Sequence, residues 1–456
     1  MTLRRLLKMN AASLLLLSYL AAIGIGTLLL ILPPSTADGR MAFIDALFTA
    51  TSAICVTGLV VVDTGSFFTP FGQAILLFMI QLGGLGIMTL SVTVFQLMGR
   101  DVSFRQRMIL QDVFSHTPRQ DIFQLLKAIL VFTAATEAVG MVLLVPVWIE
   151  SCGWPRALYV AAFHSVSAFC NAGFSLFSES FADFRGNPLL NATVCSLIVL
   201  GGIGFPVVYD LIQGFKPRHI KENRTKRLVQ TKTVLATTAV LIVTGAAVFA
   251  AGEHENVLKA ASFGKTILVS CFQSITCRTA GFNTVDIRAL SSPTLMLMLF
   301  LMFIGASPGS CGGGIKTTSL AVLVAFGWSR LWRRARVNLF KKSIPRETVI
   351  KTLALVVLSI SLIFLSSFVL LFTLPPAQPP GTDHERFLSI LFEVFSAFGT
   401  VGLSMGATAT LDTMGKAVII FMMLVGRVGV LTFAYVIAGI SATRGVEYAE
   451  ENIMIG

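Results

Sequence analysis

Long apolar stretches alternate with short polar or basic ones along the whole chain. Residues 9–37, 64–99 and 352–382 contain no Asp, Glu, Lys or Arg. Each stretch exceeds the roughly 20 residues with which an α-helix crosses a bilayer core. Strands of a membrane barrel would instead alternate polarity over about ten residues. The pattern therefore predicts an all-α polytopic membrane protein.

Composition and charge support this prediction. Apolar residues make up 55% of the 456 residues and charged residues only 13%, which places the chain in the membrane class. A net charge of +12 could indicate a nucleic-acid partner, but 24 of the 35 Lys and Arg fall in five segments: 1–8, 100–127, 216–232, 330–351 and the tail from 444. Under the positive-inside rule, both termini and the three basic loops are expected to be cytoplasmic. The expected surroundings are a lipid bilayer rather than nucleic acid.

A short motif occurs four times, and each copy lies between two apolar stretches. It runs from a Ser or Thr through small and apolar residues to a glycine and a bulky apolar residue. The copies are Ser52–Leu59, Ser167–Phe174, Thr276–Phe282 and Ser396–Leu403. Their glycines are more than 100 residues apart, a period far longer than that of a solenoid, so each unit is expected to be a folded subdomain.

Each unit is predicted to contain a first membrane helix (M1), a short pore helix, the glycine segment and a second membrane helix (M2). We expect M1 helices at about 10–32, 122–149, 228–251 and 348–374, and M2 helices at about 70–99, 188–214, 293–330 and 412–441. The repeats then divide the chain at 1–99, 100–214, 215–336 and 337–456. These units are predicted to surround one pore in a pseudo-fourfold arrangement.

The four glycine segments are the candidate ion filter. A glycine can adopt positive φ, which lets successive backbone carbonyls point the same way and replace the hydration shell of a cation. The alternative is four ordinary re-entrant turns. No acidic ring accompanies the segments, which favours a monovalent cation over calcium and other divalent ions. The candidate residues are Val56, Thr57, Gly58, Asn171, Ala172, Gly173, Thr279, Ala280, Gly281, Thr400, Val401 and Gly402.

The M2 helix of the third repeat is expected to break. Residues 305–318 are rich in glycine and contain Pro308. Such residues free backbone groups that lipid cannot satisfy, so this loop should lie inside the bundle, beneath the filter. It is the candidate gate, with Gly305, Gly309, Gly312, Gly313 and Gly314 as its flexible positions.

Two basic residues accompany this loop. Lys316 follows it, and Arg427 lies in the fourth M2 helix. An arginine near the centre of a membrane helix costs roughly 2.5–3.5 kcal/mol and usually faces a protein or water-filled interior. We expect Arg427 to hold the loop closed, whereas Lys316 could also extend to the cytoplasm. A phosphate loop is not expected here, because Ile315 separates the last glycine from the lysine and the stretch follows a membrane helix.

Other polar positions have simpler interpretations. The residues nine positions before the glycines are Thr49, His164, Phe272 and Glu393. Glu393 could attract cations at the mouth, although a solvated helix face is the commoner explanation, and His164 is expected to be a packing residue. Arg278 should point behind the filter and hold its backbone. Glu137 has no evident partner.

The M2 glycines Gly83, Gly201 and Gly426 match small-residue helix packing, with a hinge or pore-lining role as the alternative. The first apolar stretch could pass for a signal peptide ending near Ser35–Ala37, but it is too long, and we expect it to be retained as the first M1 helix.

Several of these motifs resemble the Trk/Ktr/HKT superfamily of potassium transporters, and within it the membrane subunits of bacterial Ktr systems. The most specific parts are Cys55–Leu59, Arg278–Asn283, Ser307–Lys316 and Gly426-Arg427. The resemblance covers essentially the whole chain. The first repeat begins near residue 10, which favours the Ktr branch over Trk relatives with additional preceding helices.

This resemblance implies one filter per repeat, a gate at residues 305–318 contacted by Arg427, and a homodimer in the bacterial inner membrane. It also implies a ring of cytosolic KtrA-like subunits that bind nucleotide, and transport of K⁺ with Na⁺ as an activating ion. This chain has no dinucleotide fingerprint of its own, since Gly24-Ile25-Gly26 lies in an apolar helix. Nucleotide control is therefore expected only through the partner.

Two other classes of function compete. An alternating-access symporter usually has inverted repeats, whereas these four repeats share one orientation by their Lys and Arg distribution. An enzyme would need converging catalytic groups, and no Ser/His/Asp set, metal cluster or paired carboxylates is evident. The sequence therefore favours a gated potassium conduit without catalytic residues.

Overall fold

The four M1 helices form the long apolar elements of the molecule. The computed structural model describes residues 11–86, 122–215, 229–373 and 383–438. The M1 helices are α2 (Ala11–Ile31), α8 (Ile122–Cys152), α12 (Val229–Gly252) and α16 (Arg346–Thr373). Each is long and apolar enough to cross a membrane, and only 28% of each most apolar window is buried in the protein. The predicted M1 positions agree with these bounds to within a few residues.

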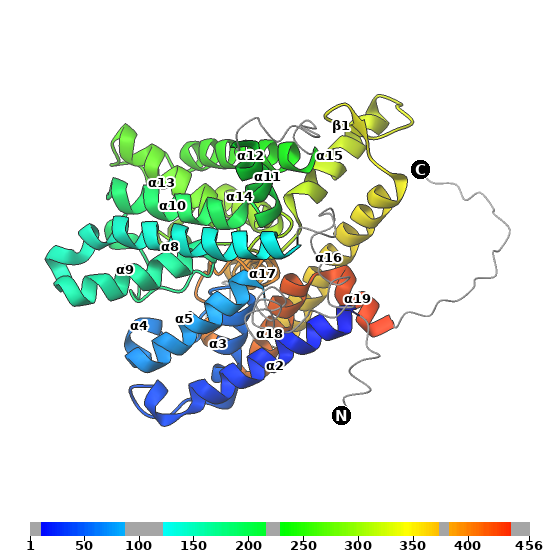
Figure 1. Cartoon of the computed structure of the whole chain (residues 1–456). Coiled ribbons are helices and arrows are strands. Elements are labelled where there is room, and N and C mark those ends of the chain that lie inside the picture. Colours follow the sequence, from blue (N-terminus) through cyan, green and yellow to red (C-terminus); the bar gives the residue numbers. More distant parts are fainter. Residues whose placement is uncertain (1–10, 87–121, 216–228, 374–382, 439–456) are drawn as a thin grey trace.

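A pore helix follows each M1 helix. The four are α3 (Phe43–Cys55), α9 (Trp154–Phe169), α13 (Phe263–Thr276) and α17 (Asp383–Gly399). Short helical turns link them to the M2 helices: α4 (Thr64–Phe67), η2 (Ala182–Phe184), η3 (Ile287–Ala289) and η4 (Thr408–Thr410). A further turn, η1 (Pro33–Ser35), lies between the first M1 helix and its pore helix. The repeated order of elements confirms the predicted fold class of four M1-pore-M2 units (Figure 1).

The M2 helices begin in a similar way in each repeat. They are α5 (Pro70–Leu85), α10 (Pro188–Gly202) with α11 (Phe205–Phe215), α14 (Ser292–Phe303) with α15 (Thr317–Leu331), and α18 (Thr413–Val428) with α19 (Val430–Ala438). Thr69, Asn187 and Asp412 cap the first, second and fourth by accepting backbone N–H groups. Such caps satisfy donors that the first helical turn leaves free. A hairpin of β1 (Asn338–Leu339) and β2 (Lys342–Ser343) separates α15 from α16.

The M2 helices bend in the second and fourth repeats as well as in the third. The bend is 96° between α10 and α11 and 102° between α18 and α19. Gly204 and Gly429 stand at these bends with φ of 96° and 95°, a conformation that an α-helix cannot continue through. The expectation of unbroken M2 helices in these two repeats was wrong. In the first repeat α5 ends at Leu85, and residues 87–99 lie outside the described residues.

Neighbouring repeats are joined at the end of the molecule that holds the loops after the filter segments. The contacts run from first to second, second to third, third to fourth, and fourth back to first. They are Tyr159 Oη to Gln73 Oε1 (2.7 Å), Phe181 N to Asn283 O (3.0 Å), Arg288 Nε to Met405 O (2.9 Å) and Lys416 Nζ to Asp45 Oδ1 (2.6 Å). The four repeats therefore close into a ring.

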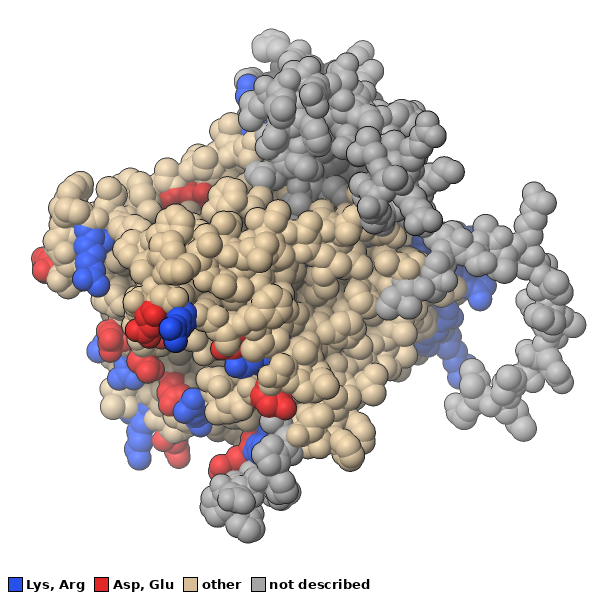
Figure 2. Space-filling model, turned by 90° about the horizontal axis from the view of Figure 1, so that it is seen from below, with Lys and Arg blue, Asp and Glu red and all other residues tan. Residues whose placement is uncertain are grey.

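Charged side chains gather at the two ends of the molecule on the face shown in Figure 2. Between the ends lies a belt of uncharged side chains, and large apolar residues such as Phe263 and Phe372 are each 82% exposed. An exposed apolar surface of this extent matches a bilayer as solvent. Asp and Glu accompany Lys and Arg at one end in Figure 2, which agrees with the charge asymmetry of the sequence.

Candidate functional site: a glycine ring and an intramembrane loop

After each pore helix, residues with positive φ alternate with a residue of ordinary negative φ. The residue two before each filter glycine has positive φ: 56° at Val56, 59° at Asn171, 75° at Thr279 and 49° at Thr400. The glycines Gly58, Gly173, Gly281 and Gly402 also have positive φ, between 69° and 93°. Left-handed backbone costs an L-residue roughly 1–2 kcal/mol. The same unfavourable conformation in all four repeats indicates a shared geometric demand.

The four glycines lie next to one another in a ring. A Cβ added at Gly58 would stand 2.4 Å from Ala172 O, and one at Gly173 would stand 2.8 Å from Ala280 O. A Cβ added at Gly281 would stand 2.3 Å from Val401 O, and one at Gly402 would stand 2.2 Å from Thr57 O. Each glycine therefore faces the carbonyl of the next repeat, and the order closes from fourth to first. Any side chain at these positions would displace a neighbouring carbonyl.

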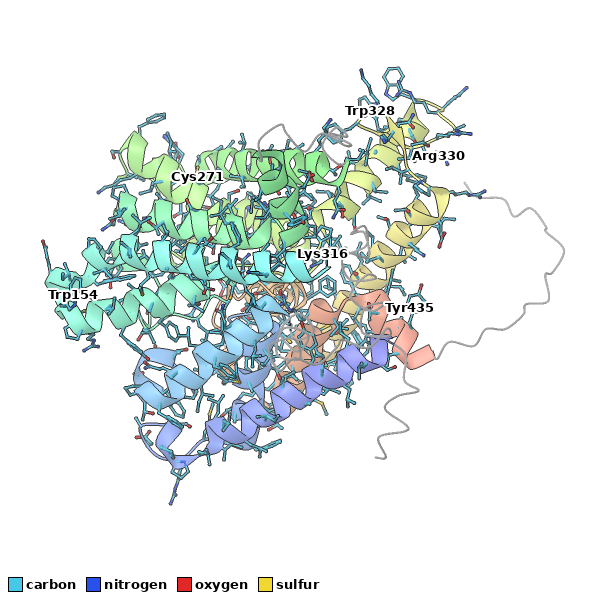
Figure 3. All side chains as sticks on the ribbon, in the orientation of Figure 1. Trp154, Cys271, Lys316, Trp328, Arg330 and Tyr435 are labelled. Atoms are coloured by element: carbon cyan, nitrogen blue, oxygen red, sulfur yellow. The ribbon has the colours of Figure 1, made fainter. Side chains whose placement is uncertain are left out.

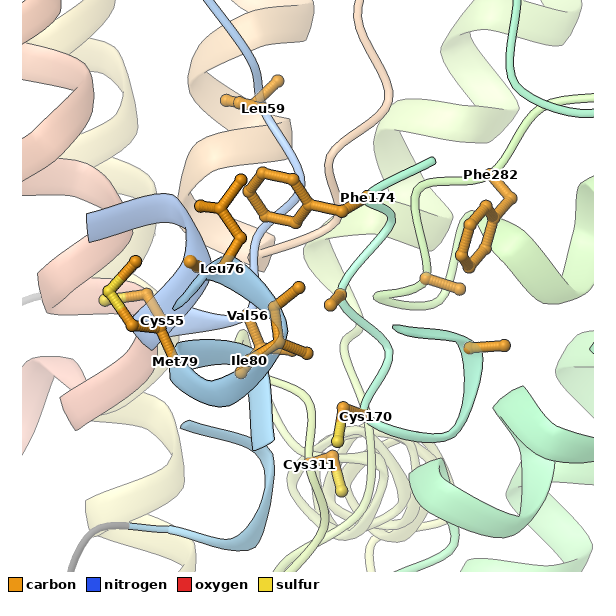
Figure 4. Close-up of a cluster of buried hydrophobic side chains, with 14 of the residues drawn as sticks. Cys55, Val56, Leu59, Leu76, Met79, Ile80, Cys170, Phe174, Phe282 and Cys311 are labelled. Carbon is orange, nitrogen blue, oxygen red and sulfur yellow. The ribbon is translucent and has the colours of Figure 1, made fainter. Parts of the chain in front are cut away.

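Hydroxyl groups of the pore helices hold the filter segments from behind. Ser52 Oγ accepts from Gly58 N and Ser396 Oγ accepts from Gly402 N, both at 3.0 Å. The other two repeats use a different bond: Ser167 Oγ donates to Phe174 O at 2.8 Å, and Thr276 Oγ1 donates to Phe282 O at 2.6 Å. The bulky residue after each glycine is buried, as Figure 4 shows for Leu59, Phe174 and Phe282. The Ser or Thr and the bulky residue of the motif thus fix the backbone of the segment.

The loop of the third repeat lies at the inner end of the ring. Gly313 N donates to Thr400 Oγ1 at 2.8 Å, and a Cβ added at Gly312 would stand 2.3 Å from Thr279 Oγ1. Figure 4 shows Cys311 of the loop beside Cys170 at the end of α9. The structure therefore brings the candidate gate residues directly against the candidate filter residues.

Backbone groups freed by the M2 bends are hydrogen-bonded to this loop. Ser307 N donates to Gly202 O at 3.1 Å and Cys311 N to Gly201 O at 3.2 Å, while Gly314 N donates to Gly426 O at 3.3 Å. A broken membrane helix needs such partners because lipid supplies none. The bends in the second and fourth repeats and the loop of the third thus satisfy each other.

Arg427 joins three repeats at this point. It lies in α18, and its guanidinium donates to Cys311 O of the loop and to Gly83 O at the end of α5. Its Nε also lies 3.4 Å from Tyr19 Oη of α2. The predicted contact between Arg427 and the loop is therefore present.

Lys316 also bonds to the loop and does not extend to the cytoplasm. Its Nζ donates to Gly312 O at 2.7 Å and to Gly313 O at 3.4 Å. Figure 3 places it inside the bundle, between the ends marked by Trp154 and Trp328. The interpretation of Lys316 as a side chain that reaches the cytoplasm was wrong, because loop carbonyls next to it supply partners within the protein.

The glycines Gly83, Gly201 and Gly426 pack against the ends of their own pore helices. A Cβ at these positions would stand 2.1 Å, 1.8 Å and 2.0 Å from the carbonyl oxygens of Ile54, Phe169 and Phe398, respectively. This close approach agrees with the packing interpretation of these glycines. The backbone bends instead at the glycines three residues after Gly201 and Gly426, namely Gly204 and Gly429, which have positive φ. These two glycines were the sequence signal for a hinge.

Glu393 is buried rather than solvated, so its interpretation as part of a solvated face was wrong. It accepts from Ser404 Oγ at 2.5 Å, Thr408 Oγ1 at 2.6 Å and Ala407 N at 3.2 Å, and thereby orders the segment after the fourth filter. His164 is buried as expected: its Nδ1 lies 2.8 Å from Val160 O, and it stacks on aromatic rings.

Two further charged residues lie close to the filter. Glu137 contacts Gln81 Nε2 at 3.3 Å, so it has the partner that the sequence did not reveal. Arg278 is buried, but its Nε has no hydrogen-bond partner among the described residues. The expectation that Arg278 holds the filter backbone therefore finds no bond to support it.

The segment after the first filter carries a carboxylate outside the membrane-spanning helices. Partial burial acts to raise the pKa of Asp63, but hydrogen bonds from Ser178 and Ser66 outweigh burial and lower that pKa. Asp63 also caps α4 by accepting from Ser66 N at 2.7 Å. A negative charge on this side favours cations near the ring.

Comparisons with known proteins give consistent results. The family model described as "TrkH: Cation transport protein" matches residues 9–441. The chain is 38% identical to the Ktr system potassium uptake protein B of Vibrio alginolyticus over 97% of this chain and 94% of that one. It is 34% identical to the potassium/sodium uptake protein NtpJ of Enterococcus hirae, over 98% of both chains. The crystal structure of the potassium transporter TrkH from Vibrio parahaemolyticus matches with a TM-score of 0.72 at 19% identity, covering 94% of this chain and 84% of that one.

Proposed function

The chain belongs to the TrkH family of cation transport proteins, as the motifs indicated, and on this premise we propose that it is the potassium-conducting membrane subunit of a Ktr-type uptake system. The observation that carries the proposal is the closed ring in which each filter glycine faces a carbonyl of the next repeat. Such a ring can replace the water around a cation with carbonyl oxygens. The names of the relatives, which refer to potassium uptake, agree with this function.

The selectivity of this filter rests on backbone atoms. The carbonyls of Thr57, Ala172, Ala280 and Val401 lie beside the glycines of the neighbouring repeats, and the pore helices end two to four residues before them. The carbonyl end of a helix carries partial negative charge, which favours a cation at the ring. Carboxylates are absent from all four segments, so a monovalent ion that accepts neutral ligands is favoured over a divalent one.

The loop at residues 305–318 is proposed as the gate. Its contacts with Thr279 and Thr400 support a position across the path that leaves the ring, where Arg427 and Lys316 would add positive charge. These charges oppose a permeating cation until the loop moves. Glycine-rich backbone is a segment that can rearrange at low steric cost.

The membrane orientation and the assembly are part of the same proposal. The proposed orientation has both termini on the cytoplasmic side of the bacterial inner membrane, and the distribution of the basic segments supports it. The word "system" in the names of the Ktr relatives refers to more than one component, which supports partner subunits. The proposed assembly is a homodimer on a ring of cytosolic nucleotide-binding subunits, as the resemblance of the motifs implies. The potassium/sodium relative supports a dependence on sodium.

An alternating-access symporter is the second candidate. The observation that favours it is the set of helix breaks at membrane depth in three M2 helices, a feature of many secondary transporters. The shared orientation of the repeats and the ring of glycines favour a conduit instead.

Ion flux into proteoliposomes tests the proposal. The purified chain should admit potassium and rubidium in preference to sodium. This preference should hold both with a potassium gradient alone and with a potassium gradient opposed by a sodium gradient. Addition of a cytosolic nucleotide-binding subunit should raise the flux. Uptake that requires a fixed stoichiometry of a second ion would favour the symporter, and absence of cation flux in both preparations would contradict the proposal.

A further inference from the structure

A cavity lies between α12, α15 and the β1–β2 hairpin, away from the filter and the loop. Its volume is about 420 Å³, which is within the range of small-ligand sites. The walls within the helices are mainly apolar and include Val240, Leu241, Leu320, Val324 and Trp328. Val240 and Val324 are about 60% exposed (59% and 61%), so the cavity opens on the surface that faces lipid.

The end of this cavity near the hairpin is basic. Arg334 and Arg336 line it and are exposed. The ion pairs found among the described residues are Lys351–Glu347 and Lys416–Asp45, so neither arginine is neutralised by a described carboxylate. The arginines lie in the basic segment 330–351, which the charge distribution assigns to the cytoplasmic side.

Trp328 marks the level of the membrane interface at this end. It lines the cavity and is 57% exposed. Figure 3 shows it with Arg330 at the end of the molecule opposite Trp154. Exposed tryptophans are enriched where the hydrocarbon core meets the headgroups. The cavity therefore runs from the hydrocarbon level to the headgroup level.

We propose that this cavity is a binding site for an anionic phospholipid of the surrounding membrane. An acyl chain fills the apolar part between α12 and α15, and the phosphate is held by Arg334 and Arg336. Basic pockets between membrane helices on the cytoplasmic side suit such headgroups. A free phosphate would leave the apolar walls uncovered, and a neutral lipid would leave two positive charges unmatched. The site goes beyond ion conduction and does not depend on it.

A bound lipid would act on the helix that carries the loop. α15 begins at Thr317, immediately after Lys316, and lines the cavity along most of its length, from Leu320 to Ser329. Lipid in the cavity therefore contacts both α15 and α12 along the wall that they share.

Quenching of Trp328 fluorescence by brominated lipid tests the site in the full chain. A Trp154→Phe/Trp332→Phe background leaves Trp328 and the fully buried Trp148, which gives a constant signal. The protein is placed in phosphatidylethanolamine vesicles that contain either brominated phosphatidylglycerol or brominated phosphatidylethanolamine at equal fractions. We expect phosphatidylglycerol to bind near Trp328 with about tenfold higher relative affinity, because each arginine near the surface attracts anionic lipid.

Charge substitutions separate a specific site from general surface attraction. The double substitution Arg334→Gln/Arg336→Gln should reduce the preference for phosphatidylglycerol until the two lipids bind equally. The control Lys341→Gln/Lys342→Gln removes the same charge from the hairpin outside the cavity and should retain the preference. Elution of each variant as a folded, monodisperse protein is checked by size exclusion. Equal quenching by both lipids would overturn the proposal, and so would an equal loss of the phosphatidylglycerol preference in both variants. The absence of quenching, because a second copy or another segment covers Trp328, would also overturn it.

Discussion

Val56, Asn171, Thr279 and Thr400 adopt the left-handed backbone that L-residues usually avoid. The sequence predicted the glycine two residues later, because glycine is the residue that tolerates positive φ. At Val56, Thr279 and Thr400 the conformation could not be predicted, because valine and threonine give no local sign of it, whereas Asn171 is of a type that adopts it more readily. The conformation recurs at the same position of all four repeats, next to the glycines that close the ring.

Gly58→Ser and Gly402→Ser should reduce potassium-over-sodium discrimination by about tenfold or more, since 1.4 kcal/mol of lost preference is enough for a factor of ten. The new Cβ would stand 2.4 Å from Ala172 O or 2.2 Å from Thr57 O and must displace that carbonyl. The measurement is competitive uptake of rubidium and sodium. Gly24→Ser, at a glycine of α2 with no atom within 4 Å of its added Cβ, should keep wild-type selectivity. Unchanged selectivity in both filter variants would remove these glycines from the filter.

Arg427→Gln should raise flux in the absence of any cytosolic subunit and lower stability by about 2 kcal/mol, in the range of a lost hydrogen bond to a charged group. The variant loses the bonds to Cys311 O and Gly83 O that hold the loop against α5. Arg427→Lys keeps the charge but not the fork that reaches both carbonyls, so its flux should be intermediate. Flux at or below wild type in a folded Arg427→Gln protein would show that the arginine does not hold the loop closed.

The M2 helices show what an element's own sequence can and cannot reveal. The break in the third repeat was predictable because glycines and a proline crowd residues 305–314. The bends at Gly204 and Gly429 were not, because a single glycine in an apolar run also suits close helix packing. Those bends depend on loop amides from the third repeat, which bond to Gly201 O, Gly202 O and Gly426 O.

Alanine at the two bends should separate backbone strain from contact with the loop. Both Gly204→Ala and Gly429→Ala should lower thermal stability, at a cost of roughly 1–3 kcal/mol for an alanine held in a sparsely populated positive-φ region. A Cβ at Gly204 would stand 2.5 Å from Pro308 O of the loop, whereas one at Gly429 meets only Thr432 Oγ1 at 3.8 Å. Gly204→Ala alone should therefore alter flux. Equal effects of both variants on flux would contradict a specific contact between Gly204 and the gate.

At the scale of the whole molecule, the fourfold arrangement followed from a repeated motif, but its joints did not. Lys416 and Asp45 meet at 2.6 Å across 371 residues of sequence, and neither residue belongs to the motif. The side-chain pairs that join neighbouring repeats differ from one junction to the next, so no repeated sequence pattern predicts them. The M1 positions, by contrast, were predictable to within a few residues, because a long apolar run forms a membrane-spanning helix in a bilayer.

Labelling of single cysteines in intact cells checks the orientation of the ring. Arg156 and Arg334 are both exposed, at opposite ends of the molecule by the proposed topology. In a Cys152→Ser/Cys195→Ser/Cys271→Ser background, which keeps only the buried native cysteines, Arg156→Cys should react with an impermeant thiol reagent and Arg334→Cys should react only after the membrane is opened. Labelling of Arg334→Cys in sealed cells would overturn the assignment of the basic segments to the cytoplasm.

The central claim is that the four glycine segments bind a dehydrated potassium-like ion. Anomalous diffraction from crystals of the chain grown with thallium or rubidium tests it most directly. We predict an anomalous peak on the axis of the ring, among the carbonyl oxygens of Thr57, Ala172, Ala280 and Val401, which weakens when potassium competes and persists in sodium. Peaks confined to surface carboxylates or to the broken M2 helices, with none inside the ring, would contradict the claim.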